Sequence, residues 1–432
     1  MSDPSRRGVL RLSAGTALLG SLALAGCGRG DTATAKASAE SVDDKPATGA
    51  VDVWAAQGDA DVLAKVLKPF ESANPDVTLK FTLIPNSEYY TKLQAAIAAG
   101  KGPDVAQFFP ESQAQFLDPS ILRPVPHGLV DSGAFFKSLW DAGVVKGVAY
   151  TVPWYAYTYA LVYRADLAKK AGVAAPATWA EMVPFFKALQ GAGAVHALGA
   201  DNGWDIFNGQ DVAMYAWQAG GNLLSSDGGW TLDTPAVVDA LKYNASFFTS
   251  GSADTATPTF LDAQPYFVSG KTATMITGPW VIGQLDTAAK KTGWTTAHVA
   301  TAPLPAGASG STSFSAGGSW GVLADSRNTD ASWKLVRHVS KPGTQVAQYS
   351  AYGSLPAVVS AWNDPAIRKQ PLLDAFLTQL KNTKAFPQVG TWQQVATRLG
   401  KEMETVAKGT QTAEKAAANI QAYAKSLGTG AE

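Results

Sequence analysis

Hydrophobic positions in the first part of the folded chain alternate between strand-like and helix-like spacing. Short apolar runs and alternating apolar residues predict three strands, over residues 51–54, 77–81 and 105–109. Apolar residues three and four positions apart predict helices over residues 63–70 and 87–100, although Pro69 is an unfavourable interior residue. Strands that alternate with helices pair in parallel and carry helices on their faces, which indicates an α/β fold.

Polar residues follow these strands at the edge where parallel sheets bind ligands. That edge lies beyond the carboxyl ends of the strands, near residues 55–59, 85–87 and 109–112. Gln57, Asp59 and Asn86 are therefore candidate ligand-binding residues. Each of them is equally well suited to a turn or a helix cap, because polar side chains also hydrogen-bond to nearby backbone groups.

Residues 147–163 form a stretch of 17 residues without a charge. A membrane helix needs about 20 apolar residues, whereas this stretch contains Pro153 and five tyrosines. These features favour buried strands or a segment that crosses between two lobes. Beyond it, Thr178 and Glu181 have the spacing of a capping box, which begins a helix of a second α/β lobe.

The first 27 residues predict export followed by lipid attachment. Arg6 and Arg7 precede an uncharged stretch over residues 12–26, the arrangement of a twin-arginine signal. That stretch is too short and too rich in small residues to span a bilayer, so residues 1–26 are predicted to be removed. Leu24 to Cys27 resembles the lipobox of bacterial lipoproteins, in which the cysteine is acylated and becomes the new N-terminus. The alternative is an incidental or buried thiol.

The segment that follows Cys27 predicts a flexible tether over residues 27–49. Small and polar residues dominate it, and Val42 is its only large apolar residue. Cys27 is the only cysteine of the chain, so no intrachain disulfide can form and stability must come from the core.

Composition indicates a globular protein with more than one core. The 432 residues are 46% hydrophobic and 16% charged, and this length suggests two lobes of ordinary domain size. The formal net charge is zero, and no basic block follows the signal, which argues against nucleic acid as a partner. The four histidines are isolated without ligand spacing, so neither a metal site nor a cofactor is expected.

Seven short motifs occur in an order that points to one family. They are Gly102–Val105, Val152–Tyr155, Leu161–Leu167, Thr178–Glu181, Ser269–Met275, Gly278–Trp280 and Gly353–Pro356. Their order and spacing, over nearly all of residues 51–427, resemble the carbohydrate-binding lipoproteins of ABC importers, the maltose-binding-protein-like extracellular solute-binding family.

The resemblance implies an α/β clamp of two lobes with hinge crossings and a cleft between the lobes. Lobe I would comprise residues 50–155 and 320–360, and lobe II residues 156–319 and 361–429. Crossings are placed near residues 155–159, 315–320 and 356–364. The protein would be a non-enzymatic, monomeric receptor, anchored by lipid at the outer face of the cytoplasmic membrane. It would capture a carbohydrate, a disaccharide or oligosaccharide, and deliver it to a membrane permease.

Sugar binding requires aromatic faces for the apolar side of a pyranose and polar groups for its hydroxyls. Trp280 matches a position that resembles the family's stacking tryptophan. Trp154 and Trp320, the latter close to Gly318 at the second crossing, are further candidates. Core packing is the alternative for each tryptophan, because large aromatics dominate protein interiors; it also accounts for Trp204 and Trp217.

The polar candidates also follow from the resemblance. Glu111 lies at a place that resembles the family's ligand carboxylate, with Phe108 or Phe109 near an aromatic position, although a solvent-facing glutamate is the alternative. Asn208 and Gln210 match another ligand stretch more loosely. Tyr157 occupies a place where relatives often hold an acidic residue, and Val358 one that is frequently arginine. These departures leave the identity of the sugar open.

Catalytic alternatives are weaker. Residues 317–321 fit the G-x-S-x-G pattern of an α/β-hydrolase with Ser319 as nucleophile. That pattern must lead from a strand directly into a helix, whereas residues 322–324 continue as a strand, and only His338 follows as a partner. Gly270 to Thr272 lacks the preceding glycine of a phosphate-binding loop and predicts a turn. A glycosidase would need two facing carboxylates, which no sequence pattern identifies. An anion, peptide or metal complex would require an Arg-lined or Tyr/His-lined cleft.

Overall fold

The computed structural model describes residues 41–430, apart from residues 59, 111, 200–203 and 256–262. The predicted signal, Cys27 and two candidate residues, Asp59 and Glu111, lie outside the described residues. Asn86 begins a helix, but its side chain is not described. Among the described helices, none has the length and apolar character that crossing a bilayer requires.

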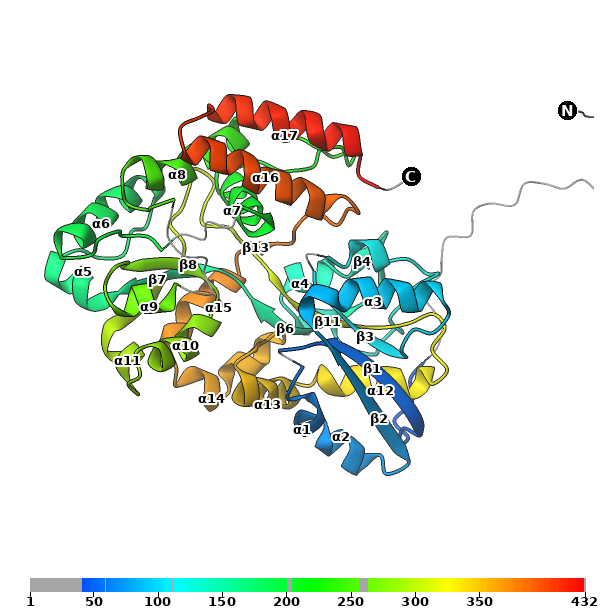
Figure 1. The fold of residues 1–432 in the computed structure, drawn as a ribbon. Coiled ribbons are helices and arrows are strands. Elements are labelled where there is room, and N and C mark those ends of the chain that lie inside the picture. Colours follow the sequence, from blue (N-terminus) through cyan, green and yellow to red (C-terminus); the bar gives the residue numbers. More distant parts are fainter. Residues whose placement is uncertain (1–40, 59, 111, 200–203, 256–262, 431–432) are drawn as a thin grey trace, which may run out of the picture. The chain divides into compact units, whose positions relative to one another are not determined.

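The first lobe is built on a six-stranded mixed sheet (Figure 1). Its strand order is β12 (Leu355–Pro356), β6 (Val152–Tyr157), β11 (Ala316–Val322), β3 (Val105–Phe108), β1 (Gly49–Ala56) and β2 (Val77–Ile84). The three strands predicted first pair in parallel, as expected. β11 and β12 pair antiparallel with their neighbours; β11 enters the sheet from chain that returns from the second lobe, and β12 follows α13 (Pro342–Tyr352).

Helices cover this sheet, and the first three lie close to the helices predicted over residues 63–70 and 87–100. The covering helices are α1 (Leu63–Val66), α2 (Lys68–Ala73), α3 (Asn86–Ala98), α4 (Lys137–Asp141), α12 (Thr329–Val339) and α13 (Pro342–Tyr352). The single helix predicted over residues 63–70 is wrong, since it is divided at Leu67. Pro69 lies in the first turn of α2. Backbone N–H groups there have no acceptor within the helix, so a proline at this position costs no helical hydrogen bond.

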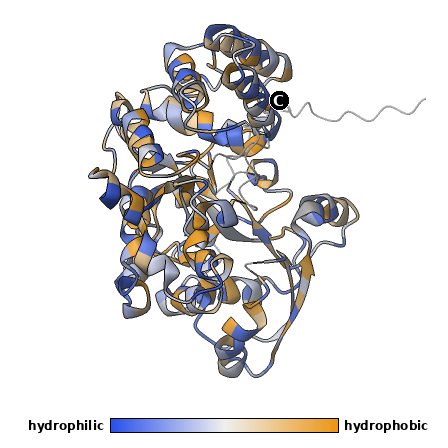
Figure 2. Ribbon diagram, turned by 60° about the vertical axis from the view of Figure 1, so that its left-hand side comes forward, coloured by the Kyte–Doolittle hydropathy of each residue, from blue (hydrophilic) through white to orange (hydrophobic). Residues whose placement is uncertain are grey.

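The second lobe has a three-stranded antiparallel sheet, in the order β8 (Thr274–Thr277), β7 (Ala160–Arg164) and β9 (Val299–Ala302). Its larger helices are α6 (Trp179–Gly191), α7 (Ile206–Gln218), α8 (Pro235–Thr249), α16 (Trp392–Ala407) and α17 (Ala413–Leu427). The remaining helices are α5 (Ala165–Ala171), α9 (Gln264–Val268), α10 (Trp280–Ala288), α11 (Trp294–His298), α14 (Pro365–Arg368) and α15 (Asp374–Leu380). Figure 2 shows hydrophobic and hydrophilic residues interleaved along the helices, as expected where each helix buries one face.

Three predicted local features of the chain are confirmed. The capping box of Thr178 and Glu181 begins α6, which buries Phe185 and Leu189. The uncharged stretch over residues 147–163 forms β6, β7 and the short strand β5 (Val148–Ala149). Gly270 lies in a turn, with a positive φ of 78° that favours glycine.

The chain passes between the two sheets at three places. β6 leads into β7 through Thr158 and Tyr159, and the Thr158 hydroxyl donates to the Phe314 carbonyl oxygen at 2.7 Å. The short strand β10 (Ser313–Phe314) pairs with β13 (Thr383–Lys384), and Ser315 then leads into β11. The third passage follows β12. The first two passages thus lie at residues 158–159 and at Ser315, and β11 joins the first sheet at Ala316.

The described end of the expected tether is attached to the first lobe. Ala47 is fully buried, and its N–H donates to the Asn74 side-chain oxygen at 2.6 Å. Asp43 lies 2.7 Å from the ammonium of Lys334 on α12, and that hydrogen bond lowers the pKa of Asp43. Paired charges thus hold residues that composition alone assigned to a flexible segment.

Candidate functional site

Half-buried aromatic side chains gather where the chain passes between the sheets. The Trp280 ring lies 5.2 Å from the Tyr157 ring, at an interplanar angle of 79°. It lies 6.1 Å from the ring of Tyr159, which in turn contacts Phe314 at 4.6 Å. The structure therefore brings together Trp280 and Tyr157, two residues that the sequence analysis selected from positions far apart in the chain.

Local sequence explains the position of Trp280. It is the first residue of α10, directly after β8 and Pro279. A Cβ atom on Gly278 would come within 2.0 Å of the indole ring, so only glycine lets the ring fold back over the chain. The Gly278–Pro279 pair thus fixes the indole beside the first passage between the lobes.

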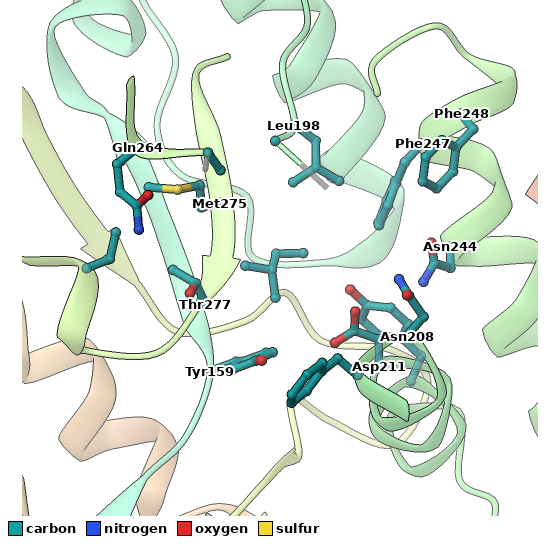
Figure 3. A pocket seen from close by; sticks show the side chains of 16 residues that line it. Tyr159, Leu198, Asn208, Asp211, Asn244, Phe247, Phe248, Gln264, Met275 and Thr277 are labelled. Atoms are coloured by element: carbon teal, nitrogen blue, oxygen red, sulfur yellow. The ribbon is translucent and has the colours of Figure 1, made fainter. Parts of the chain in front are cut away.

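A cavity of about 50 Å³ lies within the second lobe beside this aromatic cluster (Figure 3). Tyr159 lines it and also contacts Trp280, so the cavity and the cluster share a wall. In Figure 3, Asn208, Asp211 and Asn244 lie on one side of the space, and Gln264, Met275 and Thr277 lie on the other. The other lining residues are Leu198, Gly199, Phe207, Tyr215, Phe247, Phe248, Ala263, Ile276 and Val281.

Helix α7 supplies the polar wall of this pocket. Its N-cap is Asp205, whose carboxylate accepts from the Phe207 N–H at 2.9 Å, while the Asp205 N–H donates to the Asn208 side-chain oxygen at 3.2 Å. A Cβ on Gly209 would lie 1.9 Å from the carbonyl oxygen of Ala396 on α16, so glycine permits the close approach of the two helices. Capping and close packing thus set the position of α7 along the pocket.

The first lobe presents a second set of residues near the carboxyl ends of its strands. Gln57 is exposed after β1, and Phe109 is half-buried after β3, where its N–H donates to the Tyr90 hydroxyl at 2.8 Å. Tyr352 at the end of α13 is 47% exposed, and a Cβ built on Gly58 would lie 3.2 Å from its hydroxyl. Tyr352 is thus an exposed aromatic residue beside the strand end that carries Gln57.

Side chains from the second lobe reach this edge. Gln388 donates from Nε2 to the Pro110 carbonyl oxygen at 3.0 Å. Gln393 on α16 also hydrogen-bonds to Ser112. The loop after β3, which the sequence analysis singled out, is therefore held by both lobes.

The other aromatic candidates lie in the core. Trp154 and Trp320 are 1% and 2% exposed, and their rings lie 4.9 Å apart. A Cβ on Gly318 would lie 2.3 Å from the Tyr155 ring, so this glycine makes room for packed aromatic side chains. Their placement favours core packing over ligand contact, because a ligand would first have to displace the surrounding side chains.

The remaining weaker candidates are also enclosed. Trp204, Gln210 and Trp217 are each buried in the second lobe, and Gln210 does not line the pocket. Val358, at the position often held by arginine in relatives, is 1% exposed. Of the loosely matched pair on α7, only Asn208 lines the cavity.

Asn208 is the only described lining residue that was a sequence-based candidate, and the polar residues that were missed include Tyr159, Asp211, Asn244, Gln264 and Thr277. Asp211 could have been selected, because it lies three positions after Asn208 and so shares its helix face. Asn244 and Gln264 come from α8 and α9, and no local pattern relates them to α7. Only tertiary packing brings these elements together.

The geometry around Ser319 does not match a nucleophile elbow. Ser319 lies inside β11, which continues to Val322, and it is 1% exposed. An elbow presents its serine at a sharp turn between a strand and a helix. Within the described part of the chain, no three His, Cys, Asp or Glu side chains are grouped as metal ligands.

Comparisons with known proteins identify relatives along most of the chain. The family described as bacterial extracellular solute-binding protein matches residues 55–346. A putative binding protein of Brucella abortus is 27% identical over 362 residues, which cover 80% of this chain and 84% of that protein. The maltotriose-binding protein of Pyrococcus abyssi is 24% identical over 352 residues, covering 79% and 73%.

The fold also matches a solved structure. The sugar-binding protein MalE from Xanthomonas citri superposes with a TM-score of 0.81 at 28% identity, covering 88% of this chain and 97% of that one. This similarity confirms the predicted α/β fold of two lobes.

Proposed function

Because the chain belongs to the family of bacterial extracellular solute-binding proteins, we propose that it captures a carbohydrate and delivers it to an ABC-type membrane permease. The family membership confirms the resemblance predicted from the ordered motifs. The observation that carries the proposal is the aromatic cluster around Trp280, placed at the passage between lobes and beside a polar pocket.

The chemistry of the cluster and the pocket suits a sugar. Half-buried tyrosine and tryptophan rings offer apolar faces to a pyranose, and amide and hydroxyl groups can pair with its hydroxyls. Two of the compared proteins are named for sugars, one for maltotriose and one as a sugar-binding protein. A disaccharide or oligosaccharide could contact residues of both lobes, as in binding proteins that close around a ligand.

Attachment of this receptor to the membrane follows from its N-terminus. Members of the family act outside the cytoplasm. In this chain, the twin arginines and the lipobox-like tetrad indicate export followed by acylation at Cys27. Several acyl chains would hold the protein stably, since one chain alone binds only marginally. The proposed location is the outer face of the cytoplasmic membrane, with the protein acting as a monomer beside its permease.

The proposed activity is binding without turnover. The compared relatives are binding proteins, and Ser319 lies in the middle of a strand rather than at an exposed turn. A serine-reactive phosphonate should therefore leave the purified protein unlabelled. Stoichiometric labelling at Ser319 would restore the hydrolase alternative.

A thermal-shift panel of monosaccharides, disaccharides and oligosaccharides tests the proposal directly. A ligand present at about 100 times its dissociation constant stabilises the folded state by about 2.7 kcal/mol, which raises the unfolding temperature measurably. Mass spectrometry of the recovered sugar should show it unchanged. The absence of a shift with every carbohydrate, together with a shift produced by a peptide or an inorganic anion, would overturn the assignment.

A further inference from the structure

A row of aromatic side chains leads from Trp280 into the interior of the protein. The Tyr159 ring, 6.1 Å from the Trp280 ring, lies 4.6 Å from the ring of Phe314. The Phe314 ring lies 4.9 Å from that of Phe386, which in turn stacks on Trp392 at 5.2 Å with an interplanar angle of 19°. We call these five residues the aromatic row. Its three inner members are at most 2% exposed, whereas Trp280 and Tyr159 are half-buried.

The members of the row come from separate parts of the chain. Tyr159 lies in the first passage between the sheets, and Phe314 belongs to β10, just before the second passage. Phe386 follows β13, the parallel partner of β10. The Ser315 N–H also donates to the Lys384 carbonyl oxygen at 3.1 Å. Backbone pairing thus fixes the two phenylalanines on neighbouring segments, where their rings meet.

The inner end of the row adjoins the contact between the lobes. Gln388 donates from Nε2 to two backbone oxygens, that of Phe386 at 2.9 Å and that of Pro110 at 3.0 Å. Trp392 is the first residue of α16, and Gln393 beside it makes the other described bond to the loop after β3. The side chains that hold the first lobe are therefore attached directly to the row that begins at Trp280.

Dense packing makes such a row respond as a unit. Protein interiors are packed like organic crystals, so a buried ring that shifts must displace the rings that it touches. Aromatic pairs also favour particular edge-to-face and offset arrangements, which restricts how each ring can move against the next. A sugar ring stacked on Trp280 would restrain Tyr159, and this restraint would reach Phe386 through Phe314.

We propose that Phe314 and Phe386 are positioning residues that couple a sugar stacked on Trp280 to the hydrogen bond between Gln388 and Pro110. The inference rests on the proposed function and adds the route by which the stacking site supports the contact between the lobes. Both phenylalanine rings are buried, so each acts through its neighbours and not by touching the sugar. Proximity alone does not establish coupling, which is measured as a departure from additivity when both ends are changed.

A double-mutant cycle at the two ends of the row measures this coupling. Isothermal titration would use maltotriose and cellobiose, followed by the sugar with the largest thermal shift in the panel. The proteins are the unmodified chain, Trp280→Ala, Gln388→Ala and the double variant. Because each end supports the other, the affinity lost by the double variant should be smaller, by at least about threefold, than the product of the two single losses. Losses that simply multiply would overturn the inference, and this result needs no change in the core.

Repeating the cycle in a Phe386→Leu background tests the route. Leucine remains apolar but lacks the ring faces that meet Phe314 and Trp392, so the two losses should now multiply. Phe186→Leu makes the same change at a fully buried ring of α6 outside the row, and should preserve the coupling despite its cost in stability. Coupling that persisted in folded Phe386→Leu would exclude the aromatic row as its route.

Two further outcomes are distinguished by the same measurements. Phe314→Leu breaks the row one ring earlier and replaces Phe386→Leu if that variant does not fold. If a sugar binds but the losses multiply in the unmodified background, this inference fails and the proposed function stands. If no carbohydrate of the panel binds, the proposed function fails and this inference fails with it.

Discussion

The side chain of Gln388 in the second lobe donates a hydrogen bond to the backbone oxygen of Pro110 in the first lobe, at 3.0 Å. Gln393 makes a second bond between the lobes, in which its amide Nε2 donates to the Ser112 hydroxyl. Both bonds end on the loop after β3, at the carboxyl edge of the parallel strands. The edge where parallel sheets bind ligands is therefore also a point of contact between the lobes.

Removing these two side chains should favour the open state of the receptor. Each hydrogen bond contributes about 1 kcal/mol, so Gln388→Ala with Gln393→Ala should weaken binding of the best carbohydrate in the panel by up to about 30-fold. Solution scattering should show less compaction on adding that sugar. Gln394→Ala, an exposed neighbour on α16 with no described side-chain bond, should behave as the unmodified protein. Unchanged affinity and compaction in the double variant would show that these bonds do not couple closure to binding.

Truncating Trp280 should affect binding more than folding. Trp280 is half-buried, so Trp280→Ala should weaken sugar binding by about tenfold or more while the protein remains folded. Trp280→Phe should recover part of the affinity, because a smaller ring face remains. Wild-type affinity in a folded Trp280→Ala variant would remove this residue from the site.

The contrasting substitution is Trp154→Ala. Trp154 is 1% exposed and packs against Trp320, so its loss should lower the free energy of unfolding by about 3 to 5 kcal/mol. Denaturant unfolding measures this change. If the Trp154→Ala variant were folded and stable but had lost its affinity for sugar, Trp154 would be a ligand-binding residue and not a core residue.

The attachment of residues 42–48 to α12 should depend on pH in a defined direction. Hydrogen bonding to Lys334 lowers the pKa of Asp43 from 3.8, so the stabilising contribution is present above that value and is lost as pH falls through the lowered pKa. Lys334 is held by Asp330 and Asp43, which raise its pKa, so its contribution is present at neutral pH and is lost only at strongly alkaline pH.

Hydrogen exchange of residues 42–48, corrected for intrinsic rates, measures this attachment. Protection should be high at neutral pH, fall in acid, and be reduced at all pH values in Lys334→Met. Lys341→Met, an exposed residue just beyond α12, serves as the control. Protection that persisted unchanged in Lys334→Met would show that other contacts, such as those of Arg337 with Asp44 and the Asp43 carbonyl oxygen, hold the segment alone.

Cys27→Ser should abolish acylation, because the hydroxyl cannot replace the thiol as the lipid acceptor. The variant should then be found in the soluble fraction, or remain uncleaved with its signal attached. Membrane fractionation and intact-mass measurement distinguish these outcomes. A variant that is cleaved after residue 26 and still bound to membranes would contradict the proposed anchor.

The sequence alone determined the elements, the fold class and the family. Periodicity located β1, β2, β3 and the capped start of α6, because strand alternation and capping are local properties of the chain. The ordered motifs identified the family, and with it Trp280 and Tyr157. Local sequence patterns gave two wrong predictions. They predicted one helix over residues 63–70, which is divided before Pro69. They also assigned Asp43 to a flexible segment, whereas it pairs with Lys334 roughly 290 positions away.

Tertiary structure decided which candidates can meet a ligand. Trp154, Trp320 and Trp280 were all candidate ligand-binding tryptophans from the sequence, yet of the three only Trp280 keeps part of its side chain accessible to solvent. Burial differs because it depends on packing between elements that are distant in the chain. The pocket around Asp211 joins residues of α7, α8, α9 and β8 that share no motif. Chain-local patterns report periodicity and capping, whereas the wall of a pocket is defined by side chains that only the folded arrangement brings within contact distance.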